Sequence, residues 1–229
     1  MRIAILSDIH GNMPALEAVV RDINEQAPDE IWCGGDLGWA GPWAKECISY
    51  VREARWPTIK GNTDVWITGD IHQGVPPNED PSPLQEIARA HAISDDDARW
   101  LIELPLGHSG PGSILLVHGT PRSPFDAPMP DAAPSEFEPY ENTATLVVYA
   151  HVHRAFLRRL ADGTLVCNTG SVGMPMDAET ACYLDIDRQG PDLTVRHRRV
   201  EFDRSAAVDK ARAVGGPIGR RFLSALNAE

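Results

Sequence analysis

The sequence has few cysteines, no obvious stripe of basic residues and no long apolar run. Its four cysteines are widely spaced and form no Cys-x-x-Cys pair, so neither a zinc ribbon nor a redox motif is indicated. This cysteine usage fits a reduced, cytoplasmic setting. No segment approaches the length of a membrane span, and the apolar stretch before Asp8 is too short for a signal peptide. We therefore expect no association with a membrane.

Positive charge is also scarce. The 229 residues include 21 Lys and Arg against 33 Asp and Glu, which gives a formal net charge of −12. Without a basic stripe, binding to an extended nucleic acid is not expected. An acidic protein can still process small phosphate compounds if bound metal ions reverse the charge at its site.

The remaining composition is that of an ordinary globular protein, with 42% hydrophobic and 24% charged residues. An α/β fold of this length commonly folds as one unit, so residues 1–229 are expected to form a single domain. We find no internal repeat and no low-complexity segment. The composition is compatible with a monomer or a homodimer.

The first 60 residues alternate between strand and helix patterns. Residues 2–7 are typical of a buried strand, and apolar residues at helical spacing from Met13 to Ile23 predict a helix that ends near Gln26. The alternation continues with a strand at 30–33, a helix at 43–54 and a strand at 57–60. Such a βαβαβ order predicts parallel pairing.

The rest of the chain changes character. Residues 70–83 and the proline-rich segment 119–139 predict loops, because proline and glycine interrupt regular structure. Helices are predicted at 84–93 and 95–103, and in a tail from Arg204 that is interrupted at 215–217. Strands are predicted at 113–117, 146–150, 155–160, 164–168, 181–187 and 193–200. Short turns between them favour antiparallel or mixed pairing.

Polar residues with metal-binding chemistry follow several of these strands. They are Asp8, His10, Asp36, Asn62, His118, His151 and His153. Ligands bind at such strand ends in open α/β sheets. Carboxylate, amide and imidazole donors without thiolate suit manganese, iron, zinc or a similar ion. Each residue alone is more often an ordinary turn residue or a buried histidine, so the prediction depends on their joint occurrence and order.

These segments resemble the five ordered signatures of the calcineurin-like metallophosphoesterases. The matching segments are Asp8-Ile9-His10-Gly11-Asn12, Gly35-Asp36, Gly61-Asn62-Thr63-Asp64, Val117-His118-Gly119-Thr120 and Ala150-His151-Val152-His153. In addition, residues 168–173 are similar to an Asn-Pro-Gly-Ser turn in the small bacterial phosphodiesterase branch of that family. Together the motifs cover about the first two thirds of the chain.

The resemblance implies a fold, a cofactor and a reaction. The fold would be a four-layer α/β/β/α sandwich of two mixed sheets. Two divalent ions (Mn, Fe, Zn or Ni) would be bound, one by Asp8, His10, Asp36 and His153, the other by Asp36, Asn62, His118 and His151. Asp36 would bridge them, and a metal-bridging hydroxide would attack the phosphate ester. His10, Asp36 and Asn62 are the residues to which the resemblance assigns catalysis.

One departure from the family pattern bears on the substrate. Many members have a histidine after the asparagine, where this chain has Thr63. Threonine supplies neither a positive charge nor an easily transferred proton, which favours phosphodiester or nucleotide substrates with good leaving groups. Asn12, Thr63 and Arg122 are the candidate substrate-binding residues; a solvated loop arginine is an equally good interpretation of Arg122. Trp39, Trp43 and Trp66 are candidates for base stacking, although each suits a core edge as well.

Three functions remain open at this point. The first is a metal-dependent phosphodiesterase or nucleotide phosphatase that acts on a small substrate. The second is hydrolysis of dinucleoside polyphosphates or of phosphoproteins. The third is a non-catalytic scaffold of the same fold, which the complete set of ligand residues disfavours.

Overall fold

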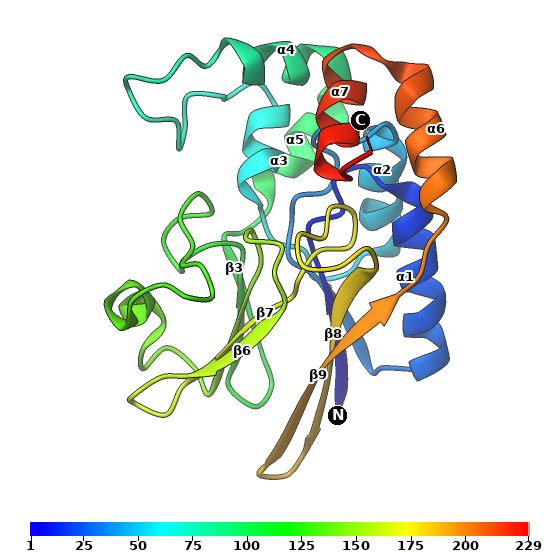
Figure 1. Ribbon diagram of the computed structural model, residues 1–229. Coiled ribbons are helices and arrows are strands. Elements are labelled where there is room, and N and C mark those ends of the chain that lie inside the picture. Colours follow the sequence, from blue (N-terminus) through cyan, green and yellow to red (C-terminus); the bar gives the residue numbers. More distant parts are fainter. Residues whose placement is uncertain (229) are drawn as a thin grey trace.

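The computed structural model describes residues 1–228 and contains two β-sheets with helices around them (Figure 1). The first sheet has the strand order β2-β1-β8-β9. Its strands are β1 (Arg2–Leu6), β2 (Glu30–Cys33), β8 (Ala181–Gln189) and β9 (Asp192–Val200). Because β1 pairs in parallel with β2 and antiparallel with β8, the first sheet is mixed.

The second sheet has the order β3-β4-β5-β7-β6. Its strands are β3 (Gly107–Gly110), β4 (Ile114–Val117), β5 (Leu146–Tyr149), β6 (Phe156–Arg159) and β7 (Leu165–Asn168). The three central strands run in parallel, whereas both edge strands pair antiparallel with their neighbours. This sheet is therefore mixed as well.

Alternation along the strands explains how the sheets pack. In β1, Ile3 and Ile5 belong to a core that also contains Ile114 and Leu116 of β4, so this core lies between the sheets. Leu6, on the other face of β1, contributes instead to the core beneath the helices. Side chains of a strand point alternately to its two faces, and here both faces are buried.

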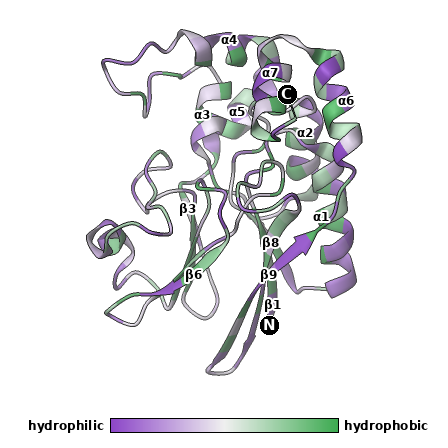
Figure 2. Ribbon diagram, in the orientation of Figure 1, coloured by the Kyte–Doolittle hydropathy of each residue, from purple (hydrophilic) through white to green (hydrophobic). Residues whose placement is uncertain are grey.

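Helices border the first sheet on its outer face and beyond the ends of its strands, and the first of them contacts β8 and β9 (Figure 1). The helices are α1 (Met13–Gln26), α2 (Ala44–Ala54), α3 (Asn62–Ile67), α4 (Ser82–His91), α5 (Asp95–Glu103), α6 (Arg204–Val214) and α7 (Gly216–Ala225). Both α1 and α6 alternate between hydrophobic and hydrophilic residues, as expected for helices with one face on a core (Figure 2). Helix α7 packs on α6 and α4. It thereby brings the end of the chain over the ends of the strands.

The outer face of the second sheet is covered differently. A 3-10 helix, η1 (Pro134–Tyr140), packs Phe137 and Tyr140 against Val147 and Tyr149 of β5. The rest of this layer is irregular, in agreement with the many prolines in the segment. The four-layer sandwich is thus confirmed, with a short 3-10 helix and loops as its fourth layer.

Several expected elements need correction. The strand predicted at 57–60 is reduced to an isolated parallel bridge between Cys33 and Thr58, because Pro57 lacks an N–H and α3 begins directly after Gly61. Helix α4 begins inside the predicted loop 70–83. Helix α3, strand β3 and the 3-10 helix η1 were not predicted, since short elements rich in glycine, proline or polar residues carry little periodic signal. Among residues 1–228, no helix combines the length and apolar character needed to cross a membrane.

Candidate metal centre

The predicted ligand residues meet at one edge of the two sheets. Asp8 and His10 follow β1, and Asp36 follows β2, so the first sheet supplies three of them. Asn62 is the first residue of α3, His118 follows β4, and the pair His151 and His153 follows β5. All are buried except His151, which is half-buried. This arrangement is consistent with the expectation that these side chains lie close together at one edge.

The backbone at this edge is strained. Asp8, His10, Asp36, His151 and His153 all have left-handed conformations, with φ between 48° and 69°. Such conformations are uncommon for residues other than glycine and are found mainly where the surrounding structure enforces them. Here the amide of Asp8 donates to the carbonyl of Gly35, and the amide of His10 donates to that of Asp36. The interlocked loops hold the side chains in a geometry that an isolated turn would rarely adopt.

Four of the side chains form a first group of donors. One donor atom each from Asp8, His10, Asp36 and His153 lies within 4.8 Å of the others. His10 Nδ1 is 3.1 Å from the carbonyl of Trp39, and His153 Nδ1 is 2.8 Å from that of Met174. Each Nδ1 therefore carries a proton, and the two Nε2 atoms face each other at 3.1 Å. Burial disfavours the charged form of His153, but Asp8, whose carboxylate is 3.2 Å from His153 Nε2, raises its pKa. Two imidazole nitrogens beside two carboxylates are donors that suit a shared cation.

A second group lies on the other side of Asp36. The Oδ1 atom of Asn62 is 3.0 Å from His118 Nε2 and 2.9 Å from His151 Nδ1. His118 Nδ1 donates to the carbonyl of Gly34 at 2.7 Å, which again leaves Nε2 facing the site. Asp36 directs Oδ1 towards His118 and Oδ2 towards His10, both at 3.5 Å. Its carboxylate thus lies between the two groups.

The electrostatics of the buried side chains suit metal binding. Burial, reinforced by His153, lowers the pKa of His10 to about 4. Burial and then His118 lower the pKa of His151 to about 4, so both imidazoles are neutral near pH 7. Burial opposes ionisation of Asp36, but His118 and His10 hold its pKa well below the usual range. Neutral imidazole and ionised carboxylate are the forms that coordinate a metal.

His118 behaves differently from His10 and His151. Burial disfavours its charged form, but Asp36, and to a lesser extent Asp8, raise its pKa to about 10. A metal ion at the second group would compete with a proton for this imidazole, since only the neutral form coordinates a metal.

Comparison with known proteins identifies the family. Residues 1–189 match the model of the calcineurin-like phosphoesterase superfamily domain, which is most of the chain. The chain belongs to this superfamily. Metallophosphoesterases use divalent metals, and the Asp and His side chains described above form a possible site for them.

Individual relatives support this assignment. The crystal structure of a metallophosphoesterase from Sphaerobacter thermophilus has a TM-score of 0.78 and 26% identity, and the match covers 100% of this chain and 99% of that one. An uncharacterized protein of Methanocaldococcus jannaschii is 26% identical over 91% of this chain and 90% of its own length. A symmetrical bis(5'-nucleosyl)-tetraphosphatase of Actinobacillus pleuropneumoniae is 30% identical over 120 residues, which is 50% of this chain and 43% of that protein.

Hydroxyl groups position Asp8 in this phosphoesterase. Ser7 Oγ donates to Asp8 Oδ2 and lies 2.6 Å from Thr169 Oγ1. Ser171 Oγ donates to the backbone carbonyl of Asp8 at 2.8 Å and accepts from the amide of Met174. The turn at 168–173 that resembles the phosphodiesterase branch therefore supports a candidate ligand. Ser171 is fully buried and its hydroxyl is engaged, so it is not placed as a nucleophile.

Asp64 connects two of the ligand loops and was not predicted as a functional residue. Its carboxylate accepts hydrogen bonds from the amides of Asp36, Leu37 and Gly61 at 2.8 to 2.9 Å. Burial and then the charge of Asp36 raise the pKa of Asp64 to about 7. Asp64 lies in the first turn of α3, where an acidic side chain can cap backbone amides. Because α3 was not predicted from the sequence, this signal was missed.

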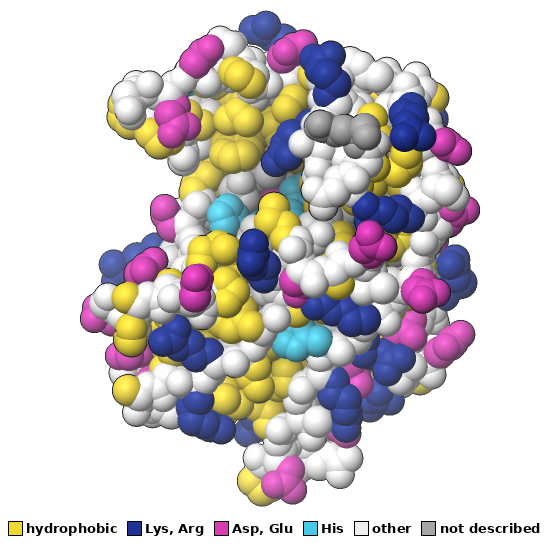
Figure 3. Space-filling model, viewed as in Figure 1, with side chains coloured by type: hydrophobic (Ala, Val, Ile, Leu, Met, Phe, Trp, Pro, Cys, Tyr) yellow, Lys and Arg dark blue, Asp and Glu magenta, His cyan; other side chains and the backbone are white. Residues whose placement is uncertain are grey.

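A cavity of about 190 Å³, called the metal cavity below, opens onto five of the candidate ligands. These are His10, Asp36, Asn62, His151 and His153. Trp39, Trp66, Met174 and Met176 provide apolar walls, and Thr63 lies beside Asn62. Two residues of α7, Arg221 and Ala225, complete the lining. Figure 3 shows histidine side chains in the hollow between the helical part of the molecule and the second sheet. The sequence pattern of the tail carried no signal that α7 would reach this cavity.

Thr63 is the substrate-binding candidate that does line the cavity. Its amide donates to Asp36 Oδ1 at 2.9 Å. Its hydroxyl is buried, and no residue among 1–228 forms a hydrogen bond with it. A buried hydroxyl without a partner is costly unless a ligand supplies one.

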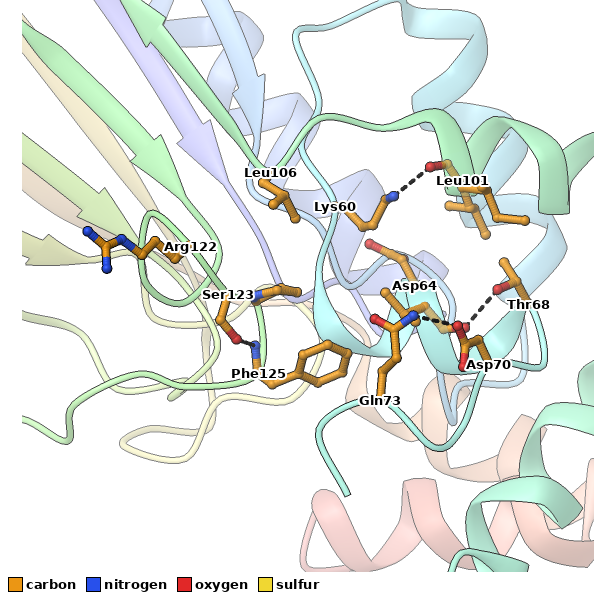
Figure 4. Close-up of a pocket in the computed structure, with 13 residues that line it drawn as sticks. Lys60, Asp64, Thr68, Asp70, Gln73, Leu101, Leu106, Arg122, Ser123 and Phe125 are labelled. Atoms are coloured by element: carbon orange, nitrogen blue, oxygen red, sulfur yellow. Dashed lines mark hydrogen bonds between the residues drawn. The ribbon is translucent and has the colours of Figure 1, made fainter. Parts of the chain in front are cut away.

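The other two substrate-binding candidates lie elsewhere. Asn12 is fully buried; it accepts from the amide of Ala15 at the start of α1 and donates to the carbonyl of Gly173. Its amide group is thus engaged as a helix cap rather than directed into the cavity. Arg122 lines a separate cavity of about 520 Å³, and its side chain extends away from Asp64 and Phe125 (Figure 4). Of the three tryptophans, Trp39 and Trp66 line the metal cavity, but Trp43 does not.

Proposed function

We propose that this protein is a binuclear metal-dependent phosphoesterase that hydrolyses small phosphodiester or nucleotide substrates. The observation that supports this most directly is the position of Asp36, whose two oxygens face two separate groups of donors. Asp8, His10, Asp36 and His153 would hold one ion, and Asp36, Asn62, His118 and His151 the other. When bound, two divalent ions supply Lewis-acid activation of the phosphoryl oxygen and of the attacking water.

The chain's own residues would orient the reacting groups. The backbone carbonyls that accept from the Nδ1 atoms of His10, His118 and His153 fix the direction of their Nε2 atoms. His151 presents Nδ1 instead and is half-buried, so among these histidines it is the one most accessible from outside the site. Its low pKa leaves it neutral near pH 7, so we do not assign it the role of a proton donor.

The cavity favours substrates with good leaving groups. By the family resemblance Thr63 replaces a histidine, and its hydroxyl offers a hydrogen bond without a positive charge. An alkoxide of high pKa would leave slowly from such a site, whereas a phenolate or a nucleotide phosphate would not depend on an acid. The half-buried Trp66 and the apolar Met174 and Met176 suit a substrate with a compact apolar or aromatic group.

Hydrolysis of a dinucleoside polyphosphate is the second candidate. It is supported by the similarity to symmetrical bis(5'-nucleosyl)-tetraphosphatases, although the alignments span about half of either protein. The metal cavity of about 190 Å³ is small for two nucleosides, and Arg122 lies in a different cavity. Rates on a dinucleoside tetraphosphate and on a simple diester, measured side by side, would separate the two candidates.

The decisive experiment removes and restores the metal. A chelator first removes bound metal from the protein. Manganese, zinc, nickel or iron is then added back, one metal at a time, and the hydrolysis of bis-p-nitrophenyl phosphate and of p-nitrophenyl phosphate is measured. Asp36→Asn is the test variant, and Asp131→Asn, at an exposed position, is the charge-matched control. We expect metal-restored turnover that Asp36→Asn abolishes and Asp131→Asn leaves intact. A folded protein that binds two ions but has no turnover with any metal would favour a scaffold instead.

A further inference from the structure

The wall of the metal cavity formed by α7 lies outside the part of the chain that matches the superfamily. The match ends at residue 189, whereas Arg221 and Ala225 belong to α7. These two residues are four apart, so they lie on one face of the helix. Both line the cavity that contains His10, Asp36 and Asn62. The end of the chain thus contributes directly to the surroundings of the candidate metal centre.

The position of α7 is fixed by packing rather than by a mobile contact. Phe222 and Leu226 are buried in the core beneath the helices, together with Ala207 and Ala211 of α6. Gly219 makes the close approach possible, because a Cβ at this position would lie 2.4 Å from the carbonyl oxygen of Ala211. The backbone that carries Arg221 is therefore held over the cavity before any ligand binds.

The lining of the cavity contains little positive charge. Among the described residues that line it, Arg221 is the only lysine or arginine. Thr63 also lines the cavity, and its buried hydroxyl has no hydrogen-bond partner in residues 1–228. A guanidinium group and a free hydroxyl are both donors, and phosphate oxygens are acceptors. The planar fork of arginine matches two oxygens of one phosphate.

We propose that Arg221 and the hydroxyl of Thr63 bind the non-bridging oxygens of the substrate phosphate. In this arrangement Arg221 supplies positive charge to the cavity from α7, and Thr63 supplies a neutral hydrogen-bond donor. The inference rests on the proposed phosphoesterase function and adds a residue that determines phosphate affinity. A dianionic monoester should depend on Arg221 more strongly than a monoanionic diester, because the attraction grows with the charge of the ligand.

The preceding residue provides a matched control. Arg220 lies on the same helix, but its guanidinium is 3.9 Å from the carboxylate of Glu86 on α4, and it does not line the cavity. Both members of this pair are well exposed, so replacing Arg220 removes the same charge from α7 without changing the cavity lining. A general effect of net charge would appear in both variants, whereas phosphate binding would appear only in Arg221 variants.

The test measures binding as well as turnover. Orthophosphate is titrated calorimetrically into the metal-loaded wild type, Arg221→Ala, Arg221→Lys and Arg220→Ala, and thermal unfolding verifies that each variant is folded. We expect Arg221→Ala to weaken phosphate binding about 10- to 100-fold, as for a lost charge-assisted hydrogen bond. Arg221→Lys should recover part of the loss, and Arg220→Ala should stay within about twofold of the wild type. In turnover, Arg221→Ala should raise KM more for p-nitrophenyl phosphate than for its diester.

Three results would overturn the inference. They are unchanged phosphate binding in Arg221→Ala, an equal loss in Arg220→Ala, and a wild type that binds two metal ions but no phosphate. Absence of turnover in the wild type would refute the proposed function, yet the phosphate titration would still decide the role of Arg221. Should Arg221→Ala be unstable, Arg221→Gln and Arg221→Lys, which keep a long side chain, allow the same comparison.

Discussion

The two walls of the metal cavity differ in construction. The ligand wall consists of His10, Asp36, Asn62, His151 and His153, while the helix wall consists of Arg221 and Ala225. Most of the ligand wall is buried, and four of its five residues have left-handed backbone conformations enforced by neighbouring loops. The helix wall is one face of a regular helix outside the part that matches the superfamily. The comparison teaches that the strained wall carries the candidate metal ligands, whereas the regular wall carries the residue proposed to bind the substrate phosphate.

The largest expected effect concerns the two groups of donors within the ligand site. His153→Ala and His118→Ala should each lower turnover by more than about 100-fold, because loss of a ligand exceeds the cost of losing an outer-shell partner. Each variant should also retain about one metal ion per chain, since the other group keeps its donors. Elemental analysis of the purified, metal-loaded variants measures this. Loss of both ions in either variant would show that the two groups do not bind separately.

Thr63→His should produce the next largest change. A histidine at this position would add a proton donor, and general acid catalysis typically contributes at least about 100-fold for a leaving group that needs a proton. We therefore expect the rate on an alkyl phosphate to rise relative to the rate on p-nitrophenyl phosphate. Steady-state rates on both substrates provide the ratio, and Thr68→His, which lies outside the metal cavity, is the control. An unchanged ratio would mean that leaving-group protonation does not limit this enzyme.

A smaller effect is expected when the helix wall is enlarged. Ala225→Phe would fill part of a cavity of about 190 Å³ and should raise KM for bis-p-nitrophenyl phosphate about 10-fold, because the phenyl group would occupy space that the substrate needs. Because the ligand wall is untouched, the bound metal should not change. Ser224→Phe is the matched control, since residue 224 is exposed on the same helix and does not line the cavity. Loss of metal in Ala225→Phe would contradict the division between the two walls.

The smallest effect is expected outside both walls. Arg122→Ala should change turnover of small esters by less than about twofold, as for an ordinary surface substitution. Its guanidinium lies at a separate cavity and is directed away from Asp64 (Figure 4). Kinetics on bis-p-nitrophenyl phosphate test this, with a dinucleoside tetraphosphate as the longer substrate. A loss of 10-fold or more on the small diester would place Arg122 in the site after all.

The fold was largely predictable because long strands and amphipathic helices carry a periodic signal. Strand β1 and helix α1 were predicted to within one or two residues at either end. Helix α3 and strand β3 were missed, since neither has enough residues to show a period. The prediction of a strand at 57–60 was wrong for a different reason. Pro57 has no backbone N–H to donate a hydrogen bond, and only one bridge to β2 forms.

The sequence by itself determined which residues stand at the ends of strands, because a strand and the turn after it are local structures. For this reason the order of residues along the chain is enough to group Asp8, His10, Asp36, His118, His151 and His153. Only the tertiary structure decided which side chains of the candidate substrate-binding residues reach the cavity. Asn12 turned inward as a helix cap, Arg122 faced another cavity, and Arg221 reached the site from the far end of the chain. These outcomes depend on packing between segments far apart in the sequence, such as α7 on α4, which no local pattern encodes.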